Sequence, residues 1–570
     1  MGLVINVGIV HCSAVQPDHF QELASMFGAG LQQILLGLPG LSSFQVDSVQ
    51  SPLGGSNVNP GSNVHGAVAS SSTCCEALAK SMGNDVVAFP NGPAYKSSIG
   101  SYFSLKEADL KPACVVMPES AHDVSLAVRT LTAGAEAWNG KCQFAIRGGG
   151  HTPFKGAANM ENGIVIDLKN IPAVGISADH KTITVSPSQT WDQVTEQLDP
   201  FDLSTLGARV AGVGVGGAVL NCGTSFFSPR YGFICDVVEE FEVVLANGDI
   251  VHASASQHPD LWKALRGGGN NFGVVTAITM KTFPQGKFWG GQTFHDISTR
   301  KKHFKAHEAL ASMHPYDPYV HYINNLVLSN VTRSWFIGNS LQYTKSDPPV
   351  IEPEVFKPLL AIEQKPLFPG GPSNTIRVDN VTSISREYAA LASYPKRWIF
   401  ATVSFAPSAD MMEEFFQLAD AAFTPLLDLD GFAVAMAYQP VPIVMSERNG
   451  AVDSLGPVQT QGNLVYIHLG ISVDENERDS DEAVEKTVQK LVEDAEAKAK
   501  KMGLHRSYLQ ATYAESWQNP IEHRSKSTLE ELLATSEKYD PHQVFQKQVP
   551  GGFKLPKVPS TGGGVRADLK

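Results

Sequence analysis

The chain has 570 residues and a mass of 61.3 kDa, and 43% of its residues are hydrophobic, so it can bury a large core and is not disordered. Its 44 basic and 57 acidic residues give a formal net charge of −13, which argues against a nucleic-acid binder, because such proteins need a basic surface. No apolar run reaches the ~18 residues that a membrane-spanning helix requires.

The N-terminal region carries few structural signals. Residues 50–72 are rich in Ser, Gly, Asn and Val, and this composition predicts a flexible linker at the end of an extension covering residues 1–72. The first basic residue is Lys80, so a secretory signal peptide with a basic start is not evident. We expect the folded body to begin near Cys74.

Short apolar runs alternate with amphipathic stretches from residue 110 to residue 285. Thr190 and Gln193 have the spacing of a capping box, and Asn247-Gly248 is a strong hairpin signal. Together these patterns predict an α+β body with helices at 123–138 and 259–265, and with strands at 114–117, 142–146, 163–168, 182–185, 239–245, 250–253 and 273–283.

The composition changes near residue 286. Glycine clusters become rarer up to about residue 505, while aromatic residues and prolines increase. A charged amphipathic pattern predicts a long helix over 481–502. A last helix is expected over 528–539, opened by a capping box at Ser527 and Glu530.

Seven cysteines are too few for a disulfide scaffold in a chain of this length, and an odd number leaves one unpaired within a monomer. No CxxC spacing or His/Cys cluster is present, so we expect no metal site. Two glycosylation sequons begin at Asn330 and Asn380, and they would matter only in a secreted glycoprotein.

Three glycine clusters carry the chemical signal: 148–150, 212–217 and 267–273. Consecutive glycines let backbone N–H groups converge on one anion, such as a diphosphate, without side-chain bulk. Gly212, Gly214 and Gly217 also match the G-x-G-x-x-G pattern of nicotinamide dinucleotide sites. That alternative lacks a continuous strand before the motif and a long helix after it, so we set it aside.

The sequences RGGGHTPFKGAAN, GVGVGGAVLNCGTSFFSPRYGFICDVV and PDLWKALRGGGNNFGVVT occur in this order, followed by YDPHQVF and VPGGF in the tail. In this combination the chain resembles berberine-bridge-enzyme-like oxidoreductases of the vanillyl-alcohol-oxidase superfamily, in their fungal form. The resemblance implies a two-part PCMH-type FAD-binding domain, formed by residues 73–285 and the C-terminal segment 506–570. Residues 286–505 would form an inserted α+β substrate domain built on an antiparallel sheet.

By position, the resemblance implies that His151 forms a covalent bond to the 8α carbon of FAD, with its imidazole as the nucleophile. Many members add a cysteinyl link, but Val210 occupies that position and Cys222 lies twelve residues too late, so we expect a single link. The histidine that directly follows the second glycine cluster in that family is replaced here by Ala218. The other expected FAD contacts are Arg147, Gly148, Gly149, Gly150, Val213, Gly214, Gly216, Gly217, Gly223, Tyr231, Gly232, Gly273, Val275 and Gln510.

Catalytic residues are less clearly marked. Tyr438 and Gln439 resemble residues on the substrate-domain sheet that face the flavin, and Tyr508 or Tyr513 would approach the ring from the tail. The motif does not decide between these two tyrosines and does not identify a general base. Val213 resembles a gatekeeper that leaves room for O2, although a packing role is equally compatible with a valine.

The implied function is hydride transfer from an alcohol, sugar or secondary metabolite to FAD, with reoxidation by O2. The alternatives are an oxidative cyclase and a flavin-binding protein without turnover. Expected partners are a small-molecule substrate and O2, with neither nucleic acid nor membrane, in a monomer or weak homo-oligomer. Cys75 and Cys114 resemble the disulfide of secreted fungal members but could equally be buried thiols, so secreted and intracellular locations both stay open.

Overall fold

The computed structural model describes residues 65–137, 142–346, 352–390, 395–447, 454–455, 458 and 462–557. Residues 1–64 of the expected N-terminal extension lie outside this range. The linker prediction is wrong for residues 65–72, because they form the beginning of helix α3 (His65–Met82). Within the described residues, no helix is both long enough and apolar enough to cross a membrane.

The first sheet follows the order β1-β2-β4-β3 and consists of β1 (Val87–Ala88), β2 (Cys114–Val116), β4 (Ile164–Asp167) and β3 (Phe144–Arg147). Strands β2, β4 and β3 are parallel, and β1 is antiparallel to β2. Helices α3 and α6 (Ala121–Ala137) pack together beside this sheet, and α4 (Pro93–Ile99) and α5 (Leu105–Ala108) precede β2. The expected pair Cys75 and Cys114 forms a disulfide, and Cys74 forms a second one with Cys142.

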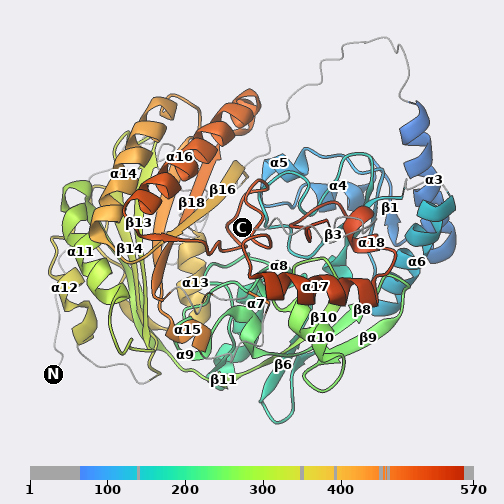
Figure 1. Cartoon of the computed structure of the whole chain (residues 1–570), viewed down its shortest axis with the longest axis horizontal. Coiled ribbons are helices and arrows are strands. Elements are labelled where there is room, and N and C mark those ends of the chain that lie inside the picture. The colour runs from blue at the N-terminus through green and yellow to red at the C-terminus, as the bar shows by residue number, and fades with distance from the viewer. Residues whose placement is uncertain are drawn as a thin grey trace, which may run out of the picture.

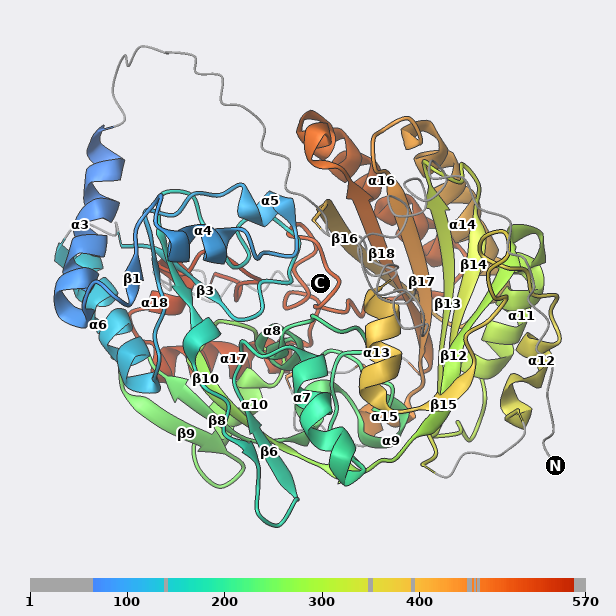
Figure 2. The same ribbon diagram turned by 180° about the vertical axis from the view of Figure 1, so that it is seen from behind.

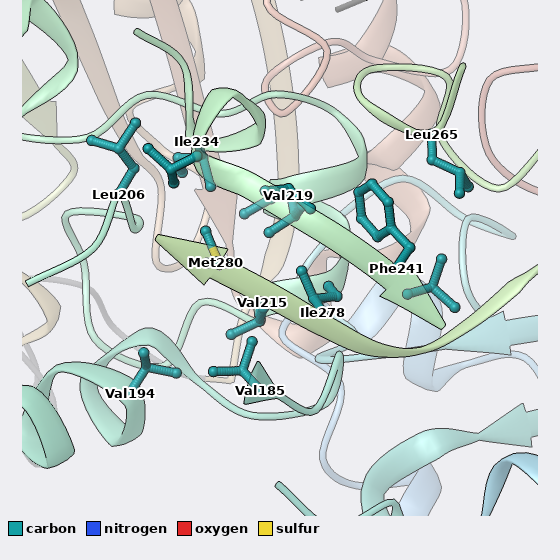
Figure 3. Close-up of a cluster of buried hydrophobic side chains, with 14 of the residues drawn as sticks. Val185, Val194, Leu206, Val215, Val219, Ile234, Phe241, Leu265, Ile278 and Met280 are labelled. Atoms are coloured by element: carbon teal, nitrogen blue, oxygen red, sulfur yellow. The ribbon is translucent and has the colours of Figure 1, made fainter. Parts of the chain in front are cut away.

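The second sheet is antiparallel, in the order β5-β6-β10-β8-β9, and contains β5 (Gly175–Ile176), β6 (Thr182–Val185), β10 (Val274–Lys281), β8 (Val238–Val244) and β9 (Ile250–Ser254). Strands β8 and β9 form the hairpin predicted at Asn247-Gly248. Figure 3 shows how side chains from this sheet, among them Phe241, Ile278 and Met280, meet those of the covering helices in one buried cluster. These helices are α7 (Trp191–Leu198), α8 (Val215–Leu220), α9 (Ser228–Tyr231) and α10 (Pro259–Leu265).

The predicted capping box opens α7, where the backbone N–H of Thr190 donates to Gln193 Oε1 at 3.0 Å. A two-stranded ladder of β7 (Leu203–Ser204) and β11 (Phe283–Pro284) then leads from this part of the chain into the third sheet.

The third sheet is the largest, with eight antiparallel strands in the order β15-β12-β14-β13-β17-β18-β16-β19. Helices α11 (Arg300–Ala311), α14 (Ala409–Phe423) and α16 (Asp481–Lys501) cover its outer face, as Figure 1 shows. The strands are β12 (Phe288–Asp296), β13 (Val320–Ser329), β14 (Phe336–Tyr343), β15 (Arg377–Asp379), β16 (Arg397–Phe405), β17 (Ala433–Val441), β18 (Leu464–Val473) and β19 (His505–Arg506).

Side chains alternate between the two faces of this sheet. On β18, Val465, Ile467 and Leu469 enter the core under the helices, so Tyr466 and His468 face the other way, toward the first two sheets. The opposite face of the eight-stranded sheet therefore contacts the glycine-rich part of the chain, for example where the Tyr466 hydroxyl lies 2.8 Å from Thr224 Oγ1.

Two segments connect the parts of the molecule. Helix α13 (Val381–Ala389), although it lies within the expected substrate domain, packs against α7, and Figure 2 shows the two side by side. Helix α17 (Lys526–Tyr539) packs against α10. Its cap is Ser525, whose Oγ accepts the Thr528 N–H at 3.1 Å, so the capping box predicted at Ser527 is wrong.

The remaining short helices are α12 (Lys357–Leu360), α15 (Val444–Glu447) and α18 (Val544–Lys547). Of these, α15 contacts α9 and so adds one more link between the large sheet and the glycine-rich part.

Candidate functional site

The three glycine clusters meet around one cavity of about 1170 Å³, measured with its open mouth. Most of the residues expected at the flavin line it: Gly148, Gly149, Gly150, His151, Val213, Gly214, Gly216, Gly217, Gly273 and Val275. The first sheet, the α8 turn and the start of β10 therefore each present bare backbone to the same space. This arrangement suits a diphosphate and a flat ring system.

The glycines are required by close backbone contact as well as by the cavity. A Cβ atom on Gly149 would lie 2.5 Å from the Cα of Gly214, and one on Gly148 would lie 2.9 Å from the carbonyl oxygen of Pro187. By contrast, a Cβ atom on Gly217 would meet no protein atom within 4 Å, because it would point into open space. Gly148 and Gly149 are thus packed against other backbone, whereas the space beside Gly217 is open.

His151 lines the cavity, and one of its ring nitrogens has no hydrogen-bond partner among the described residues. Its ring stacks on Phe103 at 3.9 Å between ring centroids, and its Nε2 is buried without a hydrogen-bond partner among the described residues. Burial lowers the pKa of His151 to about 4, so its imidazole is neutral near pH 7. A neutral imidazole in the wall of this cavity fits the nucleophile required for a flavin bond.

Arg147 does not fit the role expected for its side chain. Its guanidinium donates to the Ser98 carbonyl oxygen and to Ser101 Oγ, lies 3.5 Å from Asp167 Oδ2, and covers the ring of Tyr102. These contacts hold the side chain between the first sheet and the segment formed by α4 and the residues after it. The Arg147 side chain therefore fixes the position of the glycine loop and does not reach a diphosphate.

Four other expected contacts support the cavity wall without lining it. Gly232 adopts a φ of +95° beside Asp236, and a Cβ on Gly223 would meet Ile234 at 3.0 Å. Tyr231 stacks on Phe283 with 4.1 Å between centroids. Gln510 is buried, and its Nε2 donates to the Cys222 carbonyl oxygen at 3.3 Å, so it ties the tail to the segment after α8.

Tyr438 is wrong as a catalytic candidate. It is fully buried in the core between the large sheet and its covering helices, where it packs against Phe304 and Phe415. Its hydroxyl donates to the Met412 carbonyl oxygen at 3.3 Å. The next residue, Gln439, points to the opposite face and accepts a hydrogen bond from Tyr466 at 2.8 Å.

The two tail tyrosines have different surroundings. Tyr508 donates to Gln510 Oε1 and packs near Phe233, within a small buried cluster. Tyr513 stacks on His468 of β18, with 4.1 Å between ring centroids, and its hydroxyl accepts from Arg209. Tyr513 thus contacts His468 and Arg209, whereas Tyr508 lies near Tyr466 of the same strand.

Cys222 cannot supply a second flavin bond in this structure, because it forms a disulfide with Cys235. Val210 occupies the position at which many family members have the linking cysteine. No cysteine among the described residues lines the cavity, so His151 is the one linking position that the motifs leave there.

Gly269 and Asn270 of the third cluster also line the cavity, and sequence reasoning named no contact for the further lining residues Asn221, Ala511, Thr512, Gly552 and Phe553. Asn270 Nδ2 donates to the Gly551 carbonyl oxygen at 3.0 Å, which holds the tail against the third glycine cluster. The return of paired glycines at residues 551–552 was the available signal for this contact.

A second, smaller cavity of about 290 Å³ lies between the glycine-rich part and the large sheet. Arg209 contributes to its wall from the segment between β7 and α8, and His321 and Gln439 contribute from the large sheet. Tyr466 also lines it, and its hydroxyl lies 2.8 Å from Thr224 Oγ1.

Comparison with known proteins supports this geometry. A family model described as an FAD binding domain matches residues 112–254. The "FAD-dependent monooxygenase CTB5" of Cercospora beticola is 62% identical over 533 residues, which cover 94% of this chain and 100% of that protein.

Two solved structures share the fold. A structure titled BBE-like #28 from Arabidopsis thaliana has a TM-score of 0.67 at 16% identity, covering 85% of this chain and 100% of its own. A xylooligosaccharide oxidase from Myceliophthora thermophila C1 has a TM-score of 0.66 at 18% identity, with the same coverage. The expected α+β fold of PCMH-type FAD-binding proteins is confirmed.

Proposed function

Because the chain belongs to the berberine-bridge-enzyme-like FAD-dependent oxidoreductases, we propose that it holds FAD through one covalent bond to His151 and oxidises a small molecule of secondary metabolism. The observation that carries this proposal is the neutral His151 in the wall of the glycine-lined cavity, with a buried Nε2 that has no hydrogen-bond partner among the described residues. A bond at this nitrogen would give a buried polar atom the partner that it lacks.

When bound, FAD would accept a hydride from a substrate carbon and pass two electrons to O2. For an alcohol, loss of the C–H hydride and the O–H proton gives a carbonyl compound, and O2 takes up two electrons and two protons to give H2O2. Val213 lines the cavity and leaves little side-chain bulk there.

The chain's own contribution is to orient the substrate on the polar face of the large sheet. His468 Nε2 is buried without a hydrogen-bond partner among the described residues. Burial, aided by the positive charge of Arg209, lowers the pKa of His468 to about 3, so its imidazole is neutral. A neutral nitrogen here can accept a hydrogen bond from a substrate hydroxyl.

The experiment is anaerobic mixing of the purified holoprotein with a library of alcohols, sugars and aromatic metabolites. Bleaching of the visible flavin absorbance identifies a substrate, and H2O2 formed after O2 is admitted supports the oxidase. If no compound reduces the flavin, the proposed oxidation is wrong and the protein binds flavin without turnover.

Monooxygenation is a second candidate, because the relative from Cercospora beticola carries that name. Reaction under ¹⁸O2 separates the two: a monooxygenase places ¹⁸O in the product, whereas an oxidase places it in H2O2. A ring-forming product without ¹⁸O would identify oxidative cyclisation.

We also propose that the protein folds in the secretory pathway. Three disulfides involve six of the seven cysteines, which supports an oxidising compartment. Glycan at Asn330 or Asn380, detected by mass spectrometry of protein from its native host, would support this location. Free thiols at all six positions in that protein would contradict it.

A further inference from the structure

Glu107, on the short helix α5, is a buried carboxylate without a cationic partner. It is 0% exposed. Across the described residues, no Lys, Arg or His nitrogen lies within 4.0 Å of its carboxyl oxygens, in contrast to Asp167 and Asp236, which each pair with an arginine. A buried carboxylate is costly unless hydrogen-bond donors reach it. The donors that reach Glu107 therefore show what this side chain holds in place.

Both carboxyl oxygens of Glu107 accept hydrogen bonds from one loop that follows β3. The backbone N–H of Gly156 donates to Oε2 at 2.9 Å, and the N–H of Ala158 donates to Oε1 at 2.7 Å. Asn159 Nδ2 also donates to the main-chain carbonyl oxygen of Glu107 at 2.8 Å. Hydrogen bonds to an ionised carboxylate are roughly twice as strong as those between neutral groups. Glu107 thus fixes the backbone of this loop at two of its N–H groups.

This loop is part of the wall of the glycine-lined cavity. Phe154, Ala157 and Ala158 line the cavity, and so does His151, which precedes them in the chain. Gly156 has a φ of +88°, a conformation that suits glycine. Glu107 itself is not among the lining residues, so it acts on the cavity through the loop.

The C-terminal tail meets the same loop. A Cβ atom on Gly551 would lie 2.2 Å from the carbonyl oxygen of Gly156. Two residues later, Phe553 lines the cavity, and its ring centroid lies 5.4 Å from that of Phe154. The loop is thus placed between the carboxylate of Glu107 and the backbone of the tail, with no room to move toward Gly551.

Helix α5 is in turn fixed to the large sheet, so Glu107 has a firm position. The backbone N–H of Leu105 donates to the carbonyl oxygen of Lys396 at 2.9 Å. The backbone N–H of Trp398, on β16, donates to Ser104 Oγ at 3.2 Å. Helix α5 therefore joins the edge of the large sheet to the wall of the glycine-lined cavity.

We propose that Glu107 is a positioning residue for flavin binding: its carboxylate fixes residues 154–158 as a wall of the cavity, and without it the protein retains FAD poorly. This inference rests on the proposed function in one respect, since it takes FAD as the ligand of the cavity. Glutamine has nearly the same shape but only one oxygen acceptor. Its amide group would face a backbone N–H donor, which would leave that donor without a partner.

The first test is hydrogen–deuterium exchange of the holoprotein at about pH 8. Burial raises the pKa of Glu107 to about 7, so the carboxyl is ionised at that pH. In Glu107→Gln, the amides of Gly156 and Ala158 should exchange about tenfold faster or more than in the wild type. The matched control is Glu161→Gln, which changes an exposed carboxylate just after the loop that accepts the Lys111 N–H at 3.0 Å. It should leave both amides unchanged.

The second test is the flavin content of the folded fraction, with the visible circular dichroism of the bound flavin. Glu107→Gln should lower the ratio of flavin to protein about threefold or more and alter the dichroism. Glu107→Asp, which keeps the charge on a shorter side chain, should retain part of the content, and Glu161→Gln should equal the wild type. A residue with only a structural role would lower the urea midpoint without changing the flavin content of folded protein.

Unchanged exchange in Glu107→Gln overturns the proposal, as does faster exchange with unchanged flavin content and dichroism. If neither Glu107 variant folds, exchange in the wild type decides. The amides of Gly156 and Ala158 must then be protected, although they lie in a loop, and rapid exchange of either one overturns the proposal.

The outcome is separable from that of the proposed function. Flavin loss in Glu107→Gln, from a protein that no compound reduces, refutes the oxidation and supports the positioning role. Full flavin retention in Glu107→Gln, with reduction by a library compound, refutes the positioning role alone.

Discussion

Gly149 and Gly214 touch each other across two glycine clusters that lie far apart in the sequence, so closely that a Cβ on either would stand 2.5 Å from the Cα of the other. This contact joins the loop after β3 to the start of α8 and brings His151 to the same wall as Val213. The cradle depends on the absence of side chains at this point.

Gly149→Ala should therefore force the two backbones apart. We expect the free energy of unfolding to fall by about 1–3 kcal/mol, the usual cost of overpacking, and flavin incorporation to fall with it. Denaturation of the apoprotein in urea measures the first effect, and the ratio of flavin to protein absorbance measures the second.

Gly217→Ala is the matched control, because its Cβ would meet open space and α8 gains a better helix former. Its apoprotein should be as stable as the wild type. Equal destabilisation by the two substitutions would contradict the assigned role of the Gly149–Gly214 contact.

The two faces of β17 and β18 give a second prediction. Tyr438→Phe should leave kcat/KM for flavin reduction unchanged, because its hydroxyl only reaches the Met412 carbonyl oxygen inside the core. Tyr466→Phe removes hydrogen bonds to Gln439 and Thr224 beside the second cavity, and should lower kcat/KM about threefold to tenfold. A larger loss with Tyr438→Phe than with Tyr466→Phe would reverse our assignment of the faces.

The glycine cradle was predictable because a glycine run encodes its backbone freedom locally. The buried face of β17 could also be predicted, since Val434, Met436 and Tyr438 alternate with small alanines. This pattern places Tyr438 in the core, but the resemblance led us to name it as a catalytic candidate. The hydrogen bonds and ion pair of the Arg147 side chain could not be predicted from the sequence. Its partners Ser98 and Asp167 become neighbours only when α4 packs against the first sheet.

The surroundings of Arg209 also could not be predicted from the sequence, because its partners come from the large sheet and from the C-terminal segment. Its neighbours His321 and Tyr513 lie more than a hundred residues away along the chain. The displaced cap of α17 has a simpler cause, since Ser525 and Ser527 both suit that position and helix boundaries are uncertain by a residue or two.

Glu515 provides a pH-dependent prediction. It is 1% exposed, its Oε2 has no hydrogen-bond partner among the described residues, and burial raises its pKa to about 7. The folded state thus binds this proton more tightly than the unfolded state, whose pKa is near 4.5. The contribution of Glu515 to stability is complete below that pH and is lost as the pH rises through about 7.

Glu515→Gln should remove this dependence, worth on the order of 3 kcal/mol between about pH 4.5 and above pH 7. Urea denaturation at about pH 5 and about pH 8 gives the comparison. Glu537→Gln, at an exposed position on α17, is the control. A variant with the same pH dependence as the wild type would show that Glu515 does not contribute.

The disulfide between Cys222 and Cys235 gives a fourth prediction. The double variant Cys222→Ser/Cys235→Ser should lose about 3 kcal/mol of stability from loop-closure entropy, and Cys75→Ser/Cys114→Ser, which opens a longer loop, about 4 kcal/mol. Neither should lose the proposed covalent flavin, because neither cysteine pair is expected to bond the ring. Release of flavin from the Cys222 variant on acid precipitation would contradict the single link at His151.

The central claim is that His151 carries the flavin, and the most direct measurement is mass spectrometry of a proteolytic digest of the purified holoprotein after acid precipitation. We predict a yellow precipitate in which the peptide containing His151 has gained the mass of the flavin, and a colourless precipitate from His151→Ala. An unmodified His151 peptide with all flavin in the supernatant, or flavin that stays covalently bound in His151→Ala, would contradict the account.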